Sequence, residues 1–412
     1  MKILWLQKRP LYPATTGGRI RTLNVLRHLC AWHEITYLCN VQQGEEGAID
    51  EMRRLGLKLE TIPWREVPRD TPAFYAALAR NLMSRYPYNV AKDFDRELRQ
   101  RARALVADGS FDLVVCDFVQ MARNAIGLDV PARLLFQHNV EAQIFRRHAE
   151  NDQGRLRRGY MALQAMKMRR FEGYAGRQFD VVVAVSSRDR AMFERDYGWR
   201  HVETIDTAVD LDYFRPGAAA ERPGRVVFIG SMDWLANEDG VQHFVRDIWP
   251  LVRAQHAAAT FQIVGRNPSR AVRELAGDGV EVVGTVPDVR PYLADAAVAV
   301  VPLRIGGGTR IKIFEAMAMR KAVVSTRIGA EGLAVHSGDD VLLADEPGEF
   351  AAAVVRLLDD AEYRRQLSTA ARDLVCHRFG AETVARQFEA ACRLAVKKAF
   401  PERIERHAVV SA

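Results

Sequence analysis

The sequence predicts an α/β protein with two doubly wound domains, each built on a parallel sheet. Short runs of consecutive apolar residues alternate with longer amphipathic stretches, which is typical of strands buried on both faces and connected by helices. This alternation starts a second time after residue 224. The length of 412 residues suits two domains, at about 100–200 residues each. Hydrophobic residues make up 48% and charged residues 27% of the chain, values that exclude a disordered or low-complexity protein.

The first half is expected to contain six strands with helices between them. Each strand candidate is a continuous apolar run, and each helix candidate places apolar residues three or four positions apart. The expected strands are 3–6, 35–41, 57–62, 113–118, 134–137 and 181–185, and the expected helices include 19–32, 72–85, 93–106 and 155–177.

The second half repeats the pattern after a turn-like segment rich in proline and glycine, residues 216–224. Its expected strands are 226–229, 261–264, 280–283, 298–302, 322–325 and 341–343. Residues 360–400 have a nearly continuous helical pattern. We therefore expect a first domain over 1–215, a second over 216–380, and a C-terminal helix and tail over 381–412 that packs back on the first domain. Ligands of such sheets bind at the carboxyl ends of the strands, and we expect these edges of the two domains to face a cleft.

The net charge of +7 is unevenly distributed. Residues 1–200 hold 33 basic and 23 acidic residues, whereas 201–412 hold 26 and 29. The excess is largest in Ile144–Arg177, where nine basic residues oppose three acidic ones among methionines and aromatic residues. Such a helix suits an anionic membrane surface. Nucleic acid is a competing explanation without a supporting motif, and a solvated helix face over an ordinary core is the third.

Cysteine content and hydropathy bear on the compartment. The five cysteines form no Cys-x-x-Cys pair and their number is odd, which favours a reducing environment. No apolar run reaches the about 18 residues of a membrane span, and no signal-peptide pattern opens the chain. We expect a cytoplasmic protein, with peripheral binding to the inner face of the cell membrane as a further expectation.

Two glycine-containing loops are candidate anion sites. Gly17 and Gly18 precede a helix after the first strand, where N–H groups and the helix dipole favour an anion, although a glycine pair is also common in ordinary turns. The second loop, 305–315, follows an apolar strand and opens a helix with Thr309 as its expected N-cap.

The composition of the second loop suits a diphosphate. Three consecutive glycines, 306–308, allow backbone N–H groups to surround an anion. Arg310 and Lys312 fall in the first helical turn, where cations oppose the helix dipole unless an anion neutralises them. Glu315 can accept hydrogen bonds from sugar hydroxyls. The alternative is a flexible glycine loop with solvated charges. The Gly-Lys-Ser/Thr of a P-loop is missing, which argues against nucleotide hydrolysis of that kind.

Two Asp-x-Asp pairs mimic a metal-binding motif, at 93–95 and 210–212. The first pair opens a predicted helix, and the second lies in the segment that precedes the domain boundary. No His-Glu-x-x-His, Gly-x-Ser-x-Gly or Cys/His cluster is found in the sequence. We therefore expect no metal.

The chain resembles the family 4 glycosyltransferases over nearly its whole length. The matching motifs are Gly230 after a strand, Val264-Gly265, Val283-Gly284, Val301-Pro302-Leu303, the segment 306–319, Val323-Val324-Ser325-Thr326, the interdomain segment 207–216, and 12–18 with 33–36 in the first half. The resemblance implies the GT-B fold, with two Rossmann-like domains, and retaining, metal-independent enzymes that use nucleotide-sugar donors. Within the family, the chain is most similar to the sugar transferases associated with exosortase/PEP-CTERM exopolysaccharide systems.

The family's Glu-x7-Glu motif is only half present. Glu315 matches the second Glu, which binds the donor ribose, whereas the first, which holds the sugar ring, would fall at Gly307. His138, in the segment 136–141, resembles the family's active-site His. A histidine after an apolar strand is also a common structural feature.

The family's basic clamp on the diphosphate is also altered. Its Arg and Lys would fall near Ser231 and Glu238, neither of which is basic. We expect Arg310 and Lys312 to supply that charge instead.

The resemblance implies a retaining, metal-independent glycosyltransferase that moves a sugar from a nucleotide-sugar donor to a sugar or lipid-linked acceptor hydroxyl. We expect a role in cell-surface polysaccharide, exopolysaccharide or glycolipid biosynthesis, no cofactor besides the donor, and no nucleic acid partner. The residues expected in catalysis are His138, Arg310 and Lys312, and those expected to bind the donor are Gly17, Gly18, Gly230, Gly306, Gly307, Gly308, Thr309, Ile311 and Glu315.

Two alternatives remain open. A nucleotide-sugar 2-epimerase on the same fold would need further acid/base carboxylates in the cleft. A non-catalytic partner subunit that binds nucleotide and membrane is the other alternative, to which the missing carboxylate at Gly307 gives some weight.

Overall fold

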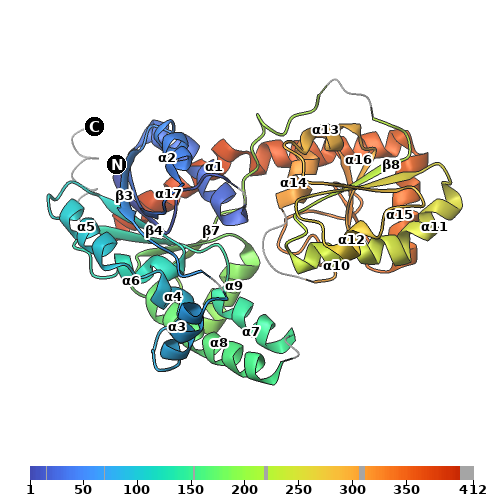
Figure 1. The fold of residues 1–412 in the computed structure, drawn as a ribbon. Helices are drawn as coiled ribbons and strands as arrows, with labels where there is room; N and C mark the ends of the chain where they lie inside the picture. The colour runs from blue at the N-terminus through green and yellow to red at the C-terminus, as the bar shows by residue number, and fades with distance from the viewer. Residues whose placement is uncertain (15, 69, 152–153, 218–220, 306–310, 400–412) are drawn as a thin grey trace, which may run out of the picture. The chain divides into compact units, whose positions relative to one another are not determined.

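The computed structural model describes residues 1–412 apart from 15, 69, 152–153, 218–220, 306–310 and 400–412. The chain forms two compact domains. The first comprises Met1–Asp206 and Val384–Ala412, and the second Thr207–Thr383. The helices and strands of each domain are labelled in Figure 1.

The first domain contains a seven-stranded sheet in the order β3-β2-β1-β4-β5-β6-β7, with every neighbouring pair parallel. Its strands are β1 (Lys2–Gln7), β2 (Glu34–Val41), β3 (Lys58–Pro63), β4 (Leu113–Asp117), β5 (Ala132–Phe136), β6 (Val181–Ala184) and β7 (Val202–Thr204). The first six confirm the sequence prediction. The short edge strand β7 was not expected, because three residues are too few to give an apolar pattern.

Helices cover both faces of this sheet (Figure 1). They are α1 (Gly17–Trp32), α2 (Glu46–Arg53), α3 (Pro72–Leu82), α4 (Tyr88–Lys92), α5 (Arg96–Val106), α6 (Ala122–Ala125), α7 (Glu141–Asn151), α8 (Arg155–Gly176), α9 (Ser187–Tyr197) and α17 (Ala381–Ala399). Among them, α5 begins later than the predicted 93–106, because the Asp95 side chain caps it by accepting from the backbone N–H of Glu97 and Leu98. Asp93 instead pairs with Lys8, Nζ to Oδ1, at 2.8 Å.

Alternation along β1 shows how the two faces are filled. Leu4 and Leu6 belong to the apolar cluster that includes side chains of α5, α8 and α9. Trp5 points to the other face, where its ring stacks on Phe388 of α17 with centroids 5.4 Å apart. Phe136 of β5 lies 4.9 Å from the same Phe388 ring, between centroids. The C-terminal helix therefore covers the sheet on the face opposite that cluster.

The second domain has a six-stranded parallel sheet in the order β10-β9-β8-β11-β12-β13. Its strands are β8 (Arg225–Ile229), β9 (Thr260–Val264), β10 (Val280–Gly284), β11 (Val298–Val301), β12 (Ala322–Ser325) and β13 (Leu342–Leu343). In both sheets the first strand has its sequence successors on one side and the fourth strand on the other. This is the doubly wound order, which confirms the predicted fold class.

Helices again lie on both faces of the second sheet (Figure 1). They are α10 (Leu235–His243), α11 (Trp249–Gln255), α12 (Arg270–Arg273), α13 (Arg290–Asp295), α14 (Ile311–Ala318), α15 (Pro347–Asp359) and α16 (Ala361–Leu374). A π-helical turn, Val375–Phe379, follows α16. The helical pattern predicted over 360–400 is therefore interrupted, and Gly380 separates α16 and this turn from α17.

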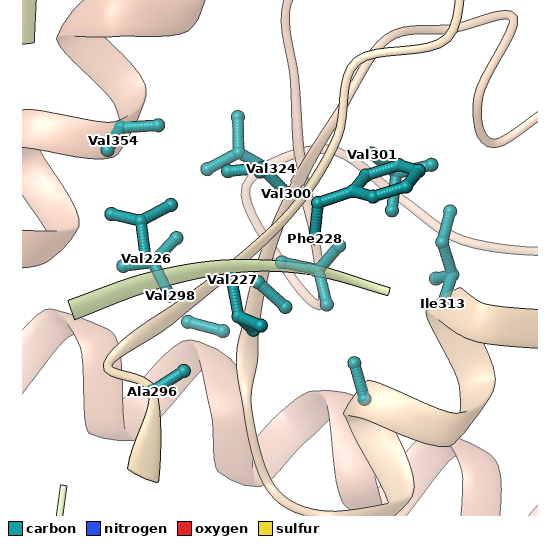
Figure 2. Packing of buried hydrophobic residues seen from close by; sticks show 14 of the residues in the cluster. Val226, Val227, Phe228, Ala296, Val298, Val300, Val301, Ile313, Val324 and Val354 are labelled. Carbon is teal, nitrogen blue, oxygen red and sulfur yellow. The ribbon is translucent and has the colours of Figure 1, made fainter. Parts of the chain in front are cut away.

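The core of the second domain forms where β8, β11 and β12 lie side by side (Figure 2). Val226, Val298 and Val324 are fully buried in these strands. Ile313 of α14 and Phe228 of β8 belong to the same cluster. This packing fixes α14 against the sheet, and α14 follows the glycine-rich loop.

The segment before the expected boundary packs on the second domain. Val209 forms a parallel bridge with Gly380, and Phe214 belongs to the second domain's apolar cluster. The division between the domains therefore falls at Asp206 and Thr207, while the turn-like segment 216–224 leads directly into β8.

Truncating Phe388 tests the role of α17 in the first domain. Phe388→Ala removes a fully buried ring from contact with Trp5 and Phe136, so we expect the free energy of unfolding of this domain to fall by about 3–5 kcal/mol. Urea unfolding followed by tryptophan fluorescence measures the change. Lys397→Ala, on the exposed side of α17, is the control. Equal stability of the two variants would contradict the assignment.

Candidate functional site

The first domain places polar side chains at the carboxyl edge of its sheet. Asp117 is the last residue of β4, and His138 lies two residues beyond the neighbouring β5. The switch in strand order falls between β1 and β4, where ligands bind in sheets of this kind. The sequence singled out His138 but missed Asp117, although Asp117 is also a polar residue at the end of a buried apolar strand.

A buried hydrogen-bond network connects these residues. His138 Nε2 lies 2.6 Å from Asp117 Oδ1, and Arg21 Nη1 lies 2.8 Å from His138 Nδ1. The other oxygen of Asp117 accepts from Trp5 Nε1 at 3.0 Å and from Thr22 Oγ1 at 2.8 Å. Because an arginine only donates, Nδ1 of His138 is an acceptor and the ring proton resides on Nε2. His138 is 2% exposed.

The electrostatics of this network keep the His138 ring neutral. Burial lowers the pKa of His138, Asp117 acts in the opposite direction, and Arg21 lowers the pKa further. Burial also lowers the pKa of Arg21 to about 10, with Asp189 and Asp117 opposing, so Arg21 is charged at pH 7. Both ring nitrogens of His138 are hydrogen-bonded to protein groups. A catalytic role of His138 stays a prediction.

Gly18 has a packing role that the sequence did not suggest. Gly17 is the first residue of α1, and a Cβ at Gly18 would lie 2.5 Å from Cζ of Phe118. The Phe118 ring in turn stacks on His138 with centroids 4.0 Å apart. The missing side chain at Gly18 therefore allows an aromatic ring to cover the histidine.

Glu172 of α8 holds the loop that carries His138. Its carboxylate is fully buried and accepts hydrogen bonds from Gln137 Nε2 at 3.0 Å and Tyr197 Oη at 2.7 Å. It also accepts from the backbone N–H groups of Glu141 and Ala142, at the start of α7. Burial raises the pKa of Glu172 to about 7, while the hydrogen bond from Tyr197 acts in the opposite direction.

In the second domain, two glycines bring strand ends into close contact. Gly230 follows β8 and Gly265 follows β9. A Cβ at Gly265 would lie 1.8 Å from the carbonyl oxygen of Gly230, so no other residue fits there without displacing backbone. This close approach lies next to the switch point between β8 and β11.

Lys312 of α14 extends to this edge of the sheet. A Cβ at Gly230 would lie 2.6 Å from Lys312 Nζ, which places the ammonium group directly beside the glycine backbone. Lys312 Nζ donates to Asn237 Oδ1 at 2.7 Å and lies 4.4 Å from the centroid of the Phe228 ring. Asn237 Nδ2 donates to the carbonyl of Ser231 at 2.7 Å. Asn237 thus orients the lysine, although no motif in the sequence singles out Asn237.

A second cation lies at the same edge. Arg266 Nε donates to Ser231 Oγ at 2.9 Å and lies 2.9 Å from Asp233 Oδ2. Met232 N–H donates to the carbonyl of Arg266. Ser231 itself is not basic. The cations near it are Arg266, which is paired with Asp233, and Lys312, and both are distant from Ser231 in sequence.

Glu315 follows Lys312 by about one helical turn. Within the described part of the chain, its carboxylate accepts no hydrogen bond. Burial raises the pKa of Glu315 to about 7, with Lys312 acting in the opposite direction. Such a carboxylate is suited to accept hydrogen bonds from ligand hydroxyls. Ile311 is 8% exposed and belongs to the buried core, so its expected contact with the donor remains a prediction from the sequence.

Five expected site residues lie outside the described part of the chain. They are Gly306, Gly307, Gly308, Thr309 and Arg310. Their assignment to the site remains a prediction from the sequence.

Part of the second domain matches a known protein family. Residues 223–360 match the family model described as Glycosyl transferases group 1. An uncharacterised 44.6 kDa protein in the cps region of Klebsiella pneumoniae is 20% identical over 358 residues, which cover 84% of this chain and 87% of that protein.

Solved structures share the whole architecture. HepE of Anabaena in complex with UDP is 14% identical with a TM-score of 0.66, covering 95% of this chain and 99% of HepE. Sucrose-phosphate synthase of Thermosynechococcus elongatus is 17% identical with a TM-score of 0.67, covering 95% and 98%. The match over 223–360 coincides with the sheet that positions Gly230, Lys312 and Glu315. This chain therefore has the GT-B fold of these structures, and its residues 223–360 match the glycosyltransferase group 1 family.

Proposed function

We propose that this chain transfers a sugar from a nucleoside diphosphate sugar to an acceptor hydroxyl, and that the diphosphate binds at the carboxyl edge of the second sheet. The observation that supports this is Lys312, whose ammonium group lies beside the Gly230 backbone and is oriented by Asn237. The position at the switch point of a doubly wound sheet is one where phosphates bind.

The chemistry follows from the leaving group. The bond between the sugar's anomeric carbon and the phosphate oxygen breaks, the acceptor oxygen forms the new bond, and negative charge develops on the diphosphate. A preorganised cation stabilises that charge, and losing one such group typically costs about 10²–10³ in rate. Lys312, with Arg310 from the sequence prediction, takes this role without a metal. Glu315 accepts hydrogen bonds from the ribose hydroxyls, and the transfer is retaining, with the diphosphate taking the acceptor's proton.

The comparisons suggest where to look for substrate and pathway. HepE of Anabaena has been solved with UDP and with UDP-glucose, so UDP-sugars are the first donors to test. The Klebsiella relative from a cps region supports a role in cell-surface polysaccharide or glycolipid synthesis. We include in this proposal that the polysaccharide is made by an exosortase-associated exopolysaccharide system, as the sequence resemblance implies.

The acceptor in this proposal is a sugar or a lipid-linked sugar, and the chain works at the cytoplasmic face of the membrane. No helix in the described ranges is long and apolar enough to span a bilayer. The basic stretch Ile144–Arg177 would contact anionic lipid.

Removing the proposed phosphate cations tests the assignment. Lys312→Ala is expected to lower turnover of a UDP-sugar by about 10²–10³, because the leaving diphosphate loses its fixed positive charge. Arg310→Ala tests the sequence-based partner in the same assay. Arg222→Ala is the control, since Arg222 is an exposed cation that precedes β8 at the opposite edge of the sheet. Near wild-type rates for both Lys312→Ala and Arg310→Ala would remove the diphosphate assignment.

Glu315 gives the protein a pH-dependent stability. Its folded pKa of about 7 lies above the usual 4.5, so the fold disfavours the ionised carboxylate. The protonated carboxyl group of Glu315 therefore contributes to the free energy of unfolding. This contribution is fully present below pH 4.5 and is lost as the pH rises through about 7. Relative to wild type, Glu315→Gln should therefore be more stable at pH 8 than at pH 5. Urea unfolding at both values measures this, and a stability difference that does not change with pH would contradict it.

Binding of UDP should depend on pH in the opposite sense. The ionised carboxylate is the better acceptor for ribose hydroxyls, so affinity of the wild type is expected to rise as the pH passes about 7. Titration calorimetry with UDP at pH 6 and pH 8 measures the change, and Glu315→Gln should lose this pH dependence.

A further inference from the structure

The first domain exposes large apolar side chains in one region. Among the residues that the structure describes there, every strongly exposed large apolar side chain lies between Val67 and Met83 or on α8. Met83 is 95% exposed and Leu156 is 93% exposed. The full set is Val67, Tyr75, Leu82, Met83, Leu156, Met166 and Tyr174. Scattered exposed apolar residues are ordinary, but a cluster on two neighbouring elements indicates an interaction surface.

The apolar residues of α3 are either exposed or only partly buried. Its sequence is largely apolar, yet the residue of α3 that is fully buried is the polar Asn81. Lys167 of α8 donates to the carbonyls of Asn81, at 2.7 Å, and Leu82, at 3.1 Å, and Gln164 donates to Asn81 Oδ1 at 3.0 Å. These polar contacts fix the end of α3 against α8. The fold therefore holds α3 in place while leaving Leu82 and Met83 accessible.

A groove of about 600 Å³ lies between the end of α3 and α8. Met83, Met166 and Tyr174 contribute apolar groups to it, and Arg85 and Arg170 contribute cations. On α8, positions 156, 163, 166, 170 and 174 fall on one side of the helix at 3.6 residues per turn. This side continues the groove along the helix.

The charge around the groove is positive. α8 carries five arginines and Lys167, and its one acidic residue is Glu172. Glu172 is fully buried and hydrogen-bonded to Gln137 and Tyr197, so it adds no exposed negative charge. The face of α8 thus combines accessible apolar groups with cations. This combination complements a surface with an anionic outer layer and an apolar interior.

We propose that α3 and α8 form a docking face for an anionic phospholipid surface. Met83, Met166 and Tyr174 enter the boundary between headgroups and acyl chains, and Arg85 and Arg170 contact the lipid phosphates. This deepens the membrane part of the proposed function by adding α3, which lies outside the basic stretch Ile144–Arg177. It does not depend on the donor site.

Vesicle flotation of the full chain tests the docking face. Vesicles of phosphatidylcholine alone are compared with vesicles that also contain phosphatidylglycerol. We expect binding only to the anionic vesicles and weakening by added salt, because ions screen exposed charges. Met83→Glu together with Met166→Glu should weaken binding by about tenfold or more, since two apolar side chains lose their favourable transfer.

A second pair of variants removes only charge. Arg85→Ala together with Arg170→Ala should weaken binding to anionic vesicles by about fivefold for each arginine. Arg53→Ala with Arg54→Ala, on exposed positions of α2, is the matched control for charge. Leu251→Glu is the control for the apolar pair, because Leu251 of the second domain is 42% exposed and Met166 is 44% exposed.

Two readouts separate this proposal from the donor site. The docking variants should keep the rise in melting temperature that UDP gives the wild type, and Lys312→Ala should keep wild-type flotation. Equal binding to both kinds of vesicle, or unchanged flotation of both docking pairs, would overturn the docking face. The docking face would also be overturned if the wild type binds no vesicles and light scattering shows dimers that Met83→Glu together with Met166→Glu disrupts.

Discussion

Parallel pairing of every strand in the two sheets is the constraint on which the rest of the structure depends. A parallel sheet needs helical crossovers, which cover both faces and leave the strand ends as the places where polar groups reach a ligand. Asp117 and His138 come together because β4 and β5 are neighbours and end at the same edge. Lys312 and Gly230 come together at the corresponding edge of the second sheet, although 82 positions separate them in sequence.

The two edges differ in what their polar groups contact. In the first domain, Arg21, Asp117 and His138 satisfy one another inside the protein, and Gly18 gives the Phe118 ring the room to cover them. In the second domain, the Asn237 amide accepts a hydrogen bond from Lys312, and Glu315 accepts no hydrogen bond within the described chain. A network whose polar groups bond to one another is suited to hold the His138 ring in place. An ammonium group beside a glycine backbone is suited to bind an anionic ligand.

At the strand end where the family has its basic clamp, this chain carries cations on other elements. At Ser231 and Glu238 the chain has no cation, but the charge at that strand end comes from Lys312 on α14 and Arg266 after β9. The glycine at 230 makes this possible, because a side chain there would occupy the space of the lysine ammonium group. A comparison of motifs position by position does not find these cations, because they come from elements distant in sequence.

The sequence by itself determined the fold class, most of the strands and the loop that leads into α14, because continuous apolar runs and glycine clusters are local patterns. It did not predict Asn237 or Asp117 as site residues, since their roles arise from neighbours far along the chain. Nor did it identify α3 as part of a surface, because the apolar sequence of α3 is the same whether the helix is buried or exposed. Only the tertiary structure decided that Asn81 faces inward and Met83 outward, since burial depends on packing between elements.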